Sequence, residues 1–331
     1  MPAIRWRLME VDPATWASTD EMPGEISASV TRDASTPLLE SANVVIESAV
    51  DAAPRETWAR LDALVDGARH AVATMLLVPV PSEVRRGRKR VSYDGYSVLK
   101  PAADVQLTAG EHIPAGADGA AEAVRMLSAC TPAPVSADGT FRLAEPMVFG
   151  VKTTYLDAAW MLVDKSGWCI QLDGDGAVHV RPMPTDAVLD VDKGGSRMIG
   201  TAVQSDDGLA GVPNRYVALD GRDSAVATDA DPDSLTSTVN RNGRIVQVVD
   251  DSPVRINGES LEQYAQRRLA DAMAAIGTRR FVMEWTPDVG LFDVIDGTFP
   301  DADLNCRMRV SKQSLTAPGQ MDTDTECVVM R

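Results

Sequence analysis

One stretch, residues 213–277, constrains the fold most, because it sets a strand, a loop, a second strand and a helix in a fixed order. The first strand is centred on residues 216–219, where Tyr-Val-Ala-Leu is rich in residues that favour β structure. The second is predicted over residues 244–249, with Ile245, Gln247 and Val249 on one face and Val246 and Val248 on the other. Between the two strands lies an acidic loop, residues 227–238. This order predicts a small sheet with a long connection.

A helix follows the second strand. Ser260 and Gln263 form a capping box, in which each side chain accepts a hydrogen bond from the backbone N–H of the other residue. The helix is predicted over residues 261–276, with its apolar residues on one stripe. Gly277 is predicted to stop it.

Short β-rich runs separated by turns make up most of the remaining chain. The 24 glycines and 20 prolines are scattered between these runs, which is typical of a strand-rich protein with many turns. One short helix is predicted among them over residues 54–62, with Pro54 near its start. Strands are predicted at residues 4–8, 25–30, 43–47, 71–80, 91–98, 280–285, 291–295, 306–312 and 326–330.

The middle of the chain combines helices with a hairpin. Asp118 is placed to cap a helix over residues 119–127. A second capping-box pattern, residues 154–157, opens another helix. Asp-Gly-Asp-Gly at residues 173–176 supplies the backbone conformations that a tight turn needs, so the strands on either side are predicted to pair.

The formal net charge of −16 limits the partners of this chain. Capture of nucleic acid is disfavoured, because neutralising phosphates requires surplus lysine and arginine. If the chain lines a conduit, acidic walls would repel a phosphate backbone and keep its passage fast. Ordinary solubility explains the same charge, and both interpretations stay open.

The sequence also predicts where the chain is made. No window approaches about 18 consecutive apolar residues, and the N-terminus lacks a charged segment followed by an apolar one. We therefore expect neither a membrane span nor a signal peptide, and synthesis in a cytoplasm.

Catalytic motifs are not found. The three histidines, His70, His112 and His179, do not form a His-Glu-x-x-His pattern. The sequence has neither a Gly-x-Ser-x-Gly nucleophile elbow nor a phosphate-binding glycine loop. No catalytic residue and no cofactor are predicted, so the chain is not expected to be an enzyme.

The acidic loop has part of a calcium-binding pattern. Asp229, Asp231 and Asp233 have the spacing of the first three ligands of an EF-hand loop. The pattern then fails, because Ser234 stands where glycine is required and Asn240 where glutamate is required. We expect no metal here and interpret the loop as an inter-subunit or inter-ring contact.

The four cysteines are far apart in sequence and show no metal or redox spacing. We predict buried thiols. A contact between Cys306 and Cys327 on neighbouring strands is conceivable, but a reducing compartment argues against a bond there.

A basic run stands out on this acidic chain. It consists of Arg85, Arg86, Arg88, Lys89 and Arg90. The run is either a solvated turn or a contact with an acidic neighbour in an assembly. Nucleic-acid binding is disfavoured, because no aromatic residues interleave with the arginines.

The stretch from residue 213 onward resembles one family. Its order is Pro-Asn-Arg-Tyr-Val, an Asp-x-Asp-Pro-Asp-Ser-x-Thr-Ser loop, a hydrophobic strand, a Glu-x-Leu-Glu-x-Tyr-Ala-x-Arg-Arg-Leu-Ala helix and paired strands. That order is similar to the hub proteins of phage tail tips and baseplates. The middle helix and Asp-Gly hairpin resemble the small α/β insert that hub proteins carry between two barrel domains. The motifs cover residues 150–331, and the N-terminal part matches in the order of its elements.

The resemblance implies a mainly β fold with α+β inserts. Two domains like the β-barrel of a tail tube would span residues 1–110 and 186–331, the second with the helix at 261–276. Small α/β elements at residues 111–185, including the hairpin at 168–181, would lie between them.

The resemblance also implies a structural function. The chain would be a virion protein of the tail tip, assembled in the host cytoplasm, that joins the tail tube to the tip proteins. It would form a homotrimer with a tube or distal tail protein ring above it and a tip, fibre or tape-measure protein below. DNA would be a partner only in transit.

Two other functions stay open on the sequence. A phage-like injection system or tailocin would share this fold. A carbohydrate-binding or glycoside-processing β protein would use Trp6, Trp16 or Trp58 as a sugar platform.

Overall fold

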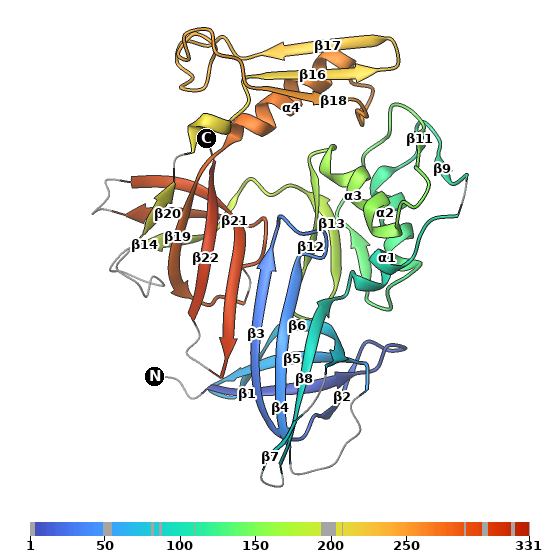
Figure 1. The fold of residues 1–331 in the computed structure, drawn as a ribbon, viewed down its shortest axis with the longest axis vertical. Helices are drawn as coiled ribbons and strands as arrows, with labels where there is room; N and C mark the ends of the chain where they lie inside the picture. Colours follow the sequence, from blue (N-terminus) through green and yellow to red (C-terminus); the bar gives the residue numbers. More distant parts are fainter. Residues whose placement is uncertain are drawn as a thin grey trace.

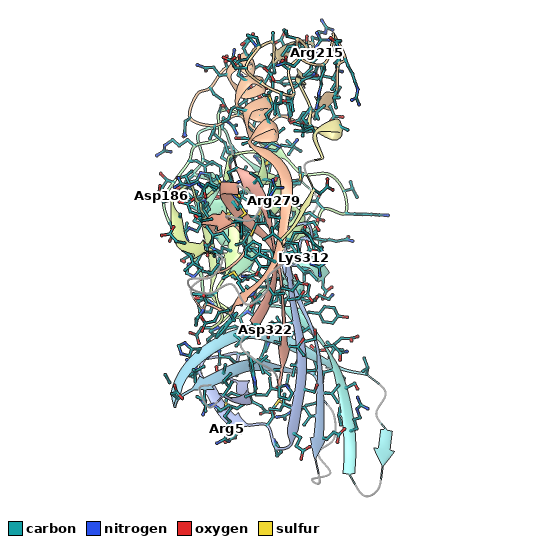
Figure 2. All side chains as sticks on the ribbon, turned by 90° about the vertical axis from the view of Figure 1, so that its left-hand side faces the viewer. Arg5, Asp186, Arg215, Arg279, Lys312 and Asp322 are labelled. Carbon is teal, nitrogen blue, oxygen red and sulfur yellow. The ribbon has the colours of Figure 1, made fainter. Side chains whose placement is uncertain are left out.

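The computed structural model describes residues 4–48, 55–80, 83–85, 88–108, 110–192, 203–206, 208–287, 289–299, 304–318 and 322–330. The described chain is mainly β, as predicted, and elongated, with the first strands at one end and a small helix-backed sheet at the other (Figure 1). Turned by 90°, it has Arg215 near one end, Arg5 toward the other and Lys312 between them (Figure 2).

One large sheet contains strands from both ends of the sequence. It holds fourteen described strands. The early strands are β1 (Ile4–Val11), β2 (Ser18–Glu21), β3 (Glu25–Asp33), β4 (Glu40–Ser48), β5 (Thr57–Val65), β6 (Ala68–Pro79), β7 (Glu83–Arg85) and β8 (Arg88–Ser97). The late strands are β14 (Ala187–Asp192), β15 (Gln204–Asp206), β19 (Ala275–Glu284), β20 (Val294–Phe299), β21 (Leu304–Ala317) and β22 (Asp322–Met330).

Strands β3 and β21 join the two halves. They pair antiparallel, with Val30 opposite Leu315 and Ala28 opposite Ala317. All four side chains belong to a buried cluster that also contains Trp285, so both halves share a core. Among the described strands, the paired order runs from β15 through this pair to β2 without closing on itself.

The helix predicted over residues 54–62 is wrong, because this segment begins strand β5. Ala59, Leu61 and Ala63 alternate along the strand and are fully buried. Strand β5 pairs on one side with β1 and on the other with β6. Apolar side chains at every second position, paired with a neighbouring strand on each side, favour a strand whatever the local helix preference.

A compact α/β part follows strand β8. It contains α1 (Lys100–Asp104), β9 (His112–Ile113), α2 (Gly119–Ser128), β10 (Val135–Ala137), β11 (Met147–Val148), α3 (Tyr155–Asp164), β12 (Trp168–Leu172) and β13 (Val178–Pro182). Strands β12 and β13 form the predicted antiparallel hairpin, and β10 pairs parallel to β13. Helices α2 and α3 pack on this sheet through a buried core that includes Leu127, Leu156 and Ile170.

A separate small sheet lies at the far end of the molecule (Figure 1). After the short helix η1 (Leu209–Gly211), β16 (Arg215–Asp220) pairs antiparallel with β17 (Asp223–Thr228) and parallel with β18 (Gln247–Asp250). Helix α4 (Leu261–Ala274) covers one face of this sheet. Its core is distinct from the main one and contains Tyr216, Ala218, Ala225, Tyr264 and Leu269. We call residues 209–274 the distal subdomain.

The three predicted helix caps are confirmed. Asp118 accepts hydrogen bonds from two backbone N–H groups of α2. The capping box at residues 154–157 is complete in α3. In α4 the Ser260 N–H donates to Gln263, and the Gln263 N–H donates to the Ser260 hydroxyl, at 2.8 and 3.2 Å.

The end of α4 differs from the prediction. The helix stops at Ala274, and the chain passes directly into β19, so Gly277 lies inside a strand. Gly277 has a φ of +80°, and the pairing of β19 with β22 shifts register between Ala275 and Thr278. Glycine therefore allows an irregularity in the strand here instead of ending the helix.

Two predicted strands begin later than expected, and one strand was not predicted. The strand predicted over residues 244–249 is the shorter β18, and the one over 291–295 is β20, which begins at Val294. Strand β17 was not predicted, since its small residues Ala225 and Ala227 give a weak β signal.

In the described part of the chain no helix is long and apolar enough to span a membrane. No disulfide joins the four cysteines. Cys169 and Cys327 are buried, as predicted, whereas Cys130 and Cys306 are only partly buried, which the sequence did not predict. Burial raises the pKa of the Cys169 thiol to about 12, which makes it unreactive at neutral pH.

Candidate assembly surfaces

The acidic loop predicted as a contact is organised by its own first aspartate. Asp229 is buried, and its carboxylate accepts the Ser234 hydroxyl at 2.6 Å and the Asp231 N–H at 3.1 Å. The Thr238 N–H and hydroxyl donate to its backbone oxygen. Asp229 therefore shapes the loop from inside and is not available to a partner.

Asn214 holds the other side of this loop. Its fully buried side chain donates to the backbone oxygens of Thr236 and Arg244 at 3.1 and 2.9 Å, and accepts the Val246 N–H at 2.9 Å. Buried hydroxyls at Thr236 and Ser237 complete the interior. The loop is thus stabilised by hydrogen bonds from buried polar groups and not by an apolar core.

The larger apolar residues in this loop and directly after it, Leu235 and Val239, face outward. Leu235 is 59% exposed and Val239 is 53% exposed, while the serine and threonine residues between them are buried or partly buried. This reverses the usual arrangement of a surface loop. A rigid loop that holds apolar side chains in water is typical of a contact surface.

Asp231 and Asp233 are the carboxylates that the loop leaves at the surface. Asp231 accepts the Asp233 N–H at 2.9 Å, and both residues are exposed. Within the described ranges, no group of three or more histidine, cysteine, aspartate or glutamate side chains is placed to hold a metal ion.

Strands β7 and β8, which contain the described residues of the basic run, lie at the opposite end of the molecule from the acidic loop (Figure 1). Arg86 lies outside the described residues, and of Arg85, Arg88 and Lys89 only the backbone, in these two strands, is described. Arg90 is exposed and lies 3.9 Å from the carboxylate of Glu47 on β4. The structure does not bring this run near the acidic loop of the same chain.

The outer face of the distal sheet carries a row of valines. Val226, Val217 and Val249 stand opposite one another across β17, β16 and β18. Val226 and Val249 are exposed, whereas Ala225 and Ala227, on either side of Val226, belong to the buried core beneath α4. This row adds to the apolar surface of the subdomain.

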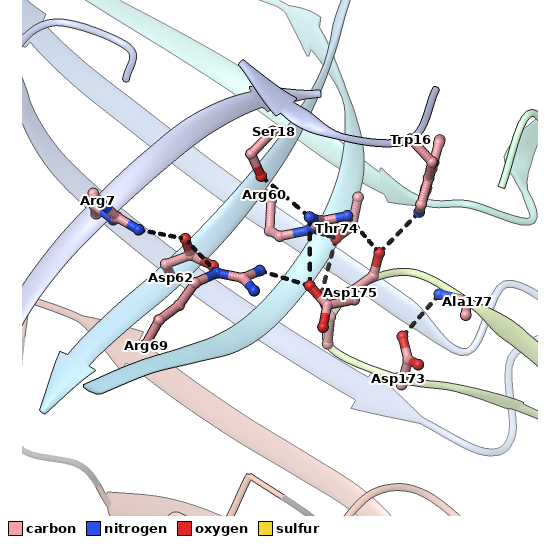
Figure 3. Close-up of polar contacts among 11 residues, drawn as sticks. Arg7, Trp16, Ser18, Arg60, Asp62, Arg69, Thr74, Asp173, Asp175 and Ala177 are labelled. Carbon is pink, nitrogen blue, oxygen red and sulfur yellow. Dashed lines mark hydrogen bonds and ion pairs between the residues drawn. The ribbon is translucent and has the colours of Figure 1, made fainter. Parts of the chain in front are cut away.

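An ionic joint holds the tip of the β12–β13 hairpin on strands β5 and β6 (Figure 3). Arg60 donates to the backbone oxygen of Asp175 at 2.7 Å, and Arg69 donates to its carboxylate at 2.6 Å. Arg69 also donates at 3.0 Å to the buried Asp62, which Arg7 contacts at 3.3 Å. The hydrogen bond to Asp62 raises the pKa of Arg69, and burial lowers that of Arg60.

Two glycines let the hairpin approach this closely. A Cβ on Gly174 would lie 2.0 Å from the backbone oxygen of Ala71, and one on Gly176 would lie 2.6 Å from the Cβ of Thr74. Trp16 closes the joint by donating from Nε1 to the Asp175 backbone oxygen at 2.9 Å. The α/β part is therefore fixed to the early strands at this point.

A second polar joint connects the distal subdomain to helix α3. Asp250 accepts the hydroxyls of Tyr216 and Tyr264 at 2.9 and 2.6 Å, and Lys165 donates to its other oxygen at 2.6 Å. Burial raises the pKa of Asp250, but hydrogen bonds from Lys165, Tyr264 and the Ser252 N–H outweigh burial and lower it to about 2. Asp250 is therefore ionised and ties the two parts together.

Two arginines of α4 add to this joint. Arg267 donates to the backbone oxygen of Lys165 at 2.9 Å, and Arg268 donates to that of Asp164 at 3.1 Å. These oxygens lie at the C-terminal end of α3, where helix carbonyls need donors and where positive charge is favourable.

His179 takes part in a surface hydrogen-bond chain that the sequence did not reveal. It lies 3.3 Å from the Ser136 hydroxyl and 3.3 Å from the Asp173 carboxylate. Ser136 and Asp173 are exposed, and Asp173 also accepts the Ala177 N–H within the hairpin turn. Water competes for each of these hydrogen bonds. We therefore interpret the three residues as a support for the hairpin and not as an activated nucleophile.

Solved structures with this fold include phage tail proteins. The tail protein from Neisseria meningitidis MC58 matches with a TM-score of 0.71 and 14% identity, over 98% of this chain and 96% of that one. The 43 kDa tail protein of prophage MuSo2 from Shewanella oneidensis matches with a TM-score of 0.68 and 10% identity, over 98% of each chain.

A third structure comes from a secretion system. The E. coli c3393 protein, described as a component of the type VI secretion system with structural similarity to T4 bacteriophage tail proteins gp27 and gp5, matches with a TM-score of 0.55 and 8% identity. That match covers 93% of this chain and 74% of the other. Comparisons of the sequence with family models and with curated proteins find no match. The resemblance to tail proteins is thus confirmed at the level of the fold.

Proposed function

We propose that this chain is the hub of a phage tail tip, a virion structural protein that joins the tail tube to the tip proteins. The observation that carries the proposal is the fold, which phage tail proteins share over 96–98% of their own length. A likeness over the whole chain supports a common architecture more strongly than a likeness confined to one module.

The proposed assembly is a homotrimer. Two units like the β-barrel of a tail tube, residues 1–110 and 186–331, would be present in each copy, with residues 111–185 between them. In such a copy the β3–β21 pairing would join the two units edge to edge in one sheet. Three copies would then present six such units to a sixfold tube above and a threefold face to the tip below.

The proposed role toward DNA is passage without binding. The net charge of −16 would line a channel with carboxylates that repel phosphates. The acidic loop and the valine row would offer contacts to other proteins, and neither of these described surfaces carries the aromatic side chains on which bases would stack.

A hub of a phage-like injection system is a second candidate. The match to the E. coli c3393 protein supports this second candidate, because that protein is described as a component of the type VI secretion system that resembles tail proteins.

Carbohydrate binding is not favoured. Trp6, Trp16 and Trp58 are all partly buried, Trp16 and Trp58 pack edge to face at 5.4 Å, and Trp16 is bonded into the hairpin joint.

Cryo-electron microscopy of the intact particle tests the proposal. We expect three copies of this chain between the tube and the tip. Six copies at that position would contradict the trimer. A different polypeptide there, with this chain elsewhere in the tail, would contradict the hub function itself.

A further inference from the structure

We propose that one face of the large sheet is the wall along which DNA passes. This face belongs to six neighbouring strands, β19, β22, β21, β3, β4 and β8, which stand side by side (Figure 1). We call it the open face. The inference rests on the proposed hub function, in which three copies surround a channel, and it assigns the surface that turns toward that channel.

The open face consists of the side chains that point away from the buried cores. It contains the even-numbered residues 90–96, 278–284, 312–316 and 322–328 and the odd-numbered residues 25–33 and 41–47. On β3 and β21 these residues alternate with the buried Val30 and Leu315. None of the side chains of the open face is buried. In the part of the chain that the structure describes, no helix or strand therefore covers this face.

The centre of the open face is polar and made of small side chains. Ser29 stands opposite Thr316 on one side and Asn43 on the other, and all three are exposed. The larger apolar members of the face, Val45, Tyr96, Val282 and Val328, are all partly buried between their neighbours. The core of a protein interface is depleted of charged residues and rich in aromatic ones. The open face therefore lacks the composition of a protein contact and is suited to remain in water.

Acidic side chains outnumber basic ones on the open face. Its basic residues are Arg90, Arg280 and Lys312, and each of them lies within ion-pair distance of a carboxylate on the same face. Further carboxylates on the face are those of Asp94, Glu284, Asp322 and Glu326, among others. The open face therefore carries a net negative charge.

Two pairs of carboxylates stand directly opposite each other on neighbouring strands. Glu25 lies opposite Glu47 across β3 and β4, and Glu284 lies opposite Asp322 across β19 and β22. Like charges in such positions destabilise a sheet, so folding stability does not explain them. A surplus of negative charge repels the phosphate backbone, which would keep DNA from binding as it passes.

The pairing of β3 with β21 makes both halves of the chain present this face on the same side. Strands β3, β4 and β8 come from residues 1–110, and strands β19, β21 and β22 come from residues 186–331. In a ring of three copies the whole open face turns either toward the axis or away from it. Its negative charge and its polar centre favour the axis, where DNA would pass.

Labelling of single cysteines tests the position of the open face. Ser29→Cys lies at its centre, and Ser128→Cys is the matched control, because Ser128 is exposed at the end of α2. Particles that have released their DNA are treated with a small maleimide or with a maleimide carried on a bulky dextran, and the unmodified chain gives the background. We expect the small reagent to label both variants and the dextran reagent to label only Ser128→Cys.

Two results of this labelling would overturn the inference and leave the proposed hub function intact. Labelling of Ser29→Cys by the dextran reagent would place the open face on the outside of the ring. Protection of Ser29→Cys from both reagents would show that another protein covers it. The purified chain is the control for folding, since both variants should react there with either reagent.

A change of charge tests the role of the carboxylates. Glu284→Lys places a lysine opposite Asp322 in place of a like charge, so we expect a protein that unfolds at a higher temperature. In the particle the same change should slow DNA release several-fold at low salt and less at high salt, because phosphates would bind the added lysine. Glu262→Lys is the matched control, because Glu262 is exposed on α4, and it should leave the rate unchanged.

Unchanged DNA release from particles with Glu284→Lys would overturn the inference alone. A different polypeptide between the tube and the tip, with this chain elsewhere in the particle, would overturn the proposed function together with the inference.

Discussion

Tyr264 donates its hydroxyl to Asp250 at 2.6 Å, so a residue from the core of the distal subdomain bonds directly to the carboxylate that also binds Lys165 of the α/β part. The same oxygen accepts the Tyr216 hydroxyl at 2.9 Å. Burial and the bond to Asp250 raise the pKa of Tyr264, which stays protonated and remains a donor at every physiological pH. One ionised carboxylate thus helps Arg267 and Arg268 to connect two parts whose buried cores are separate clusters.

The contact between Asp250 and its three donors should weaken in acid. The folded pKa of Asp250 is about 2, against an ordinary value of 3.8, so its stabilisation is fully present above pH 4 and is lost as the pH falls toward 2. The shift corresponds to about 2 kcal/mol. Urea unfolding followed between pH 6 and 3 should show a steeper loss of stability in the unmodified chain than in Asp250→Asn. Parallel curves for the two proteins would contradict this assignment.

Helix α4 should depend on its buried stripe. Leu269→Asp places an unpaired carboxylate in the core of the distal subdomain, and we expect it to unfold that subdomain at a cost of several kcal/mol. Gln266→Asp is the matched control, because residue 266 is exposed on the same helix. Hydrogen exchange of residues 215–274 would report the difference. A Leu269→Asp protein with unchanged protection would show that this face is not buried.

Sequence reasoning succeeded where structure is determined locally. Each of the three helix caps depends on side chains within three residues of the backbone groups that they bind. The β12–β13 hairpin depends on its Asp-Gly turn. These features need no knowledge of the rest of the fold, so the sequence was sufficient to predict them.

Sequence reasoning failed where distant segments decide the structure. Strand β5 contains Trp-Ala-Arg-Leu, which suits a helix, and becomes a strand because β1 and β6 pair with both its edges. The β3–β21 pairing joins residues nearly the whole chain apart, and no local pattern specifies it.

The candidate site was predicted in part. The sequence drew attention to the acidic loop, but it gave Asp229 the same role as Asp231 and Asp233, although only Asp229 is buried. It also missed Leu235 and Val239. The sequence does show single apolar residues in a loop of serine, threonine and aspartate. Whether those apolar residues are buried or exposed depends on which side chains turn inward, and the sequence does not specify that.

The contact between the β12–β13 hairpin and strand β6 should require glycine at residue 174. Gly174→Ala would place a Cβ 2.0 Å from the Ala71 backbone oxygen, so the hairpin must lift away from β6. We expect a loss of about 1–3 kcal/mol in stability, together with faster hydrogen exchange at residues 173–177. Gly211→Ala is the control, because a Cβ there meets nothing within 4 Å. Equal stability of the two variants would contradict the close approach.

The last prediction tests whether the carboxylates of the acidic loop hold its shape or bind a metal ion. Asp229 accepts two hydrogen bonds inside the loop, so Asp229→Asn replaces one acceptor oxygen with a donor and should loosen residues 229–246. Asp231→Asn should leave the loop intact, because Asp231 accepts one exposed bond. Titration calorimetry with calcium should give no heat for the unmodified chain or either variant. Calcium binding tighter than about 1 mM that is lost in Asp231→Asn would show that the loop is a cation site. Protection of residues 229–246 that falls in Asp229→Asn alone, with no calcium signal, would show that this carboxylate serves only to hold the apolar side chains outward.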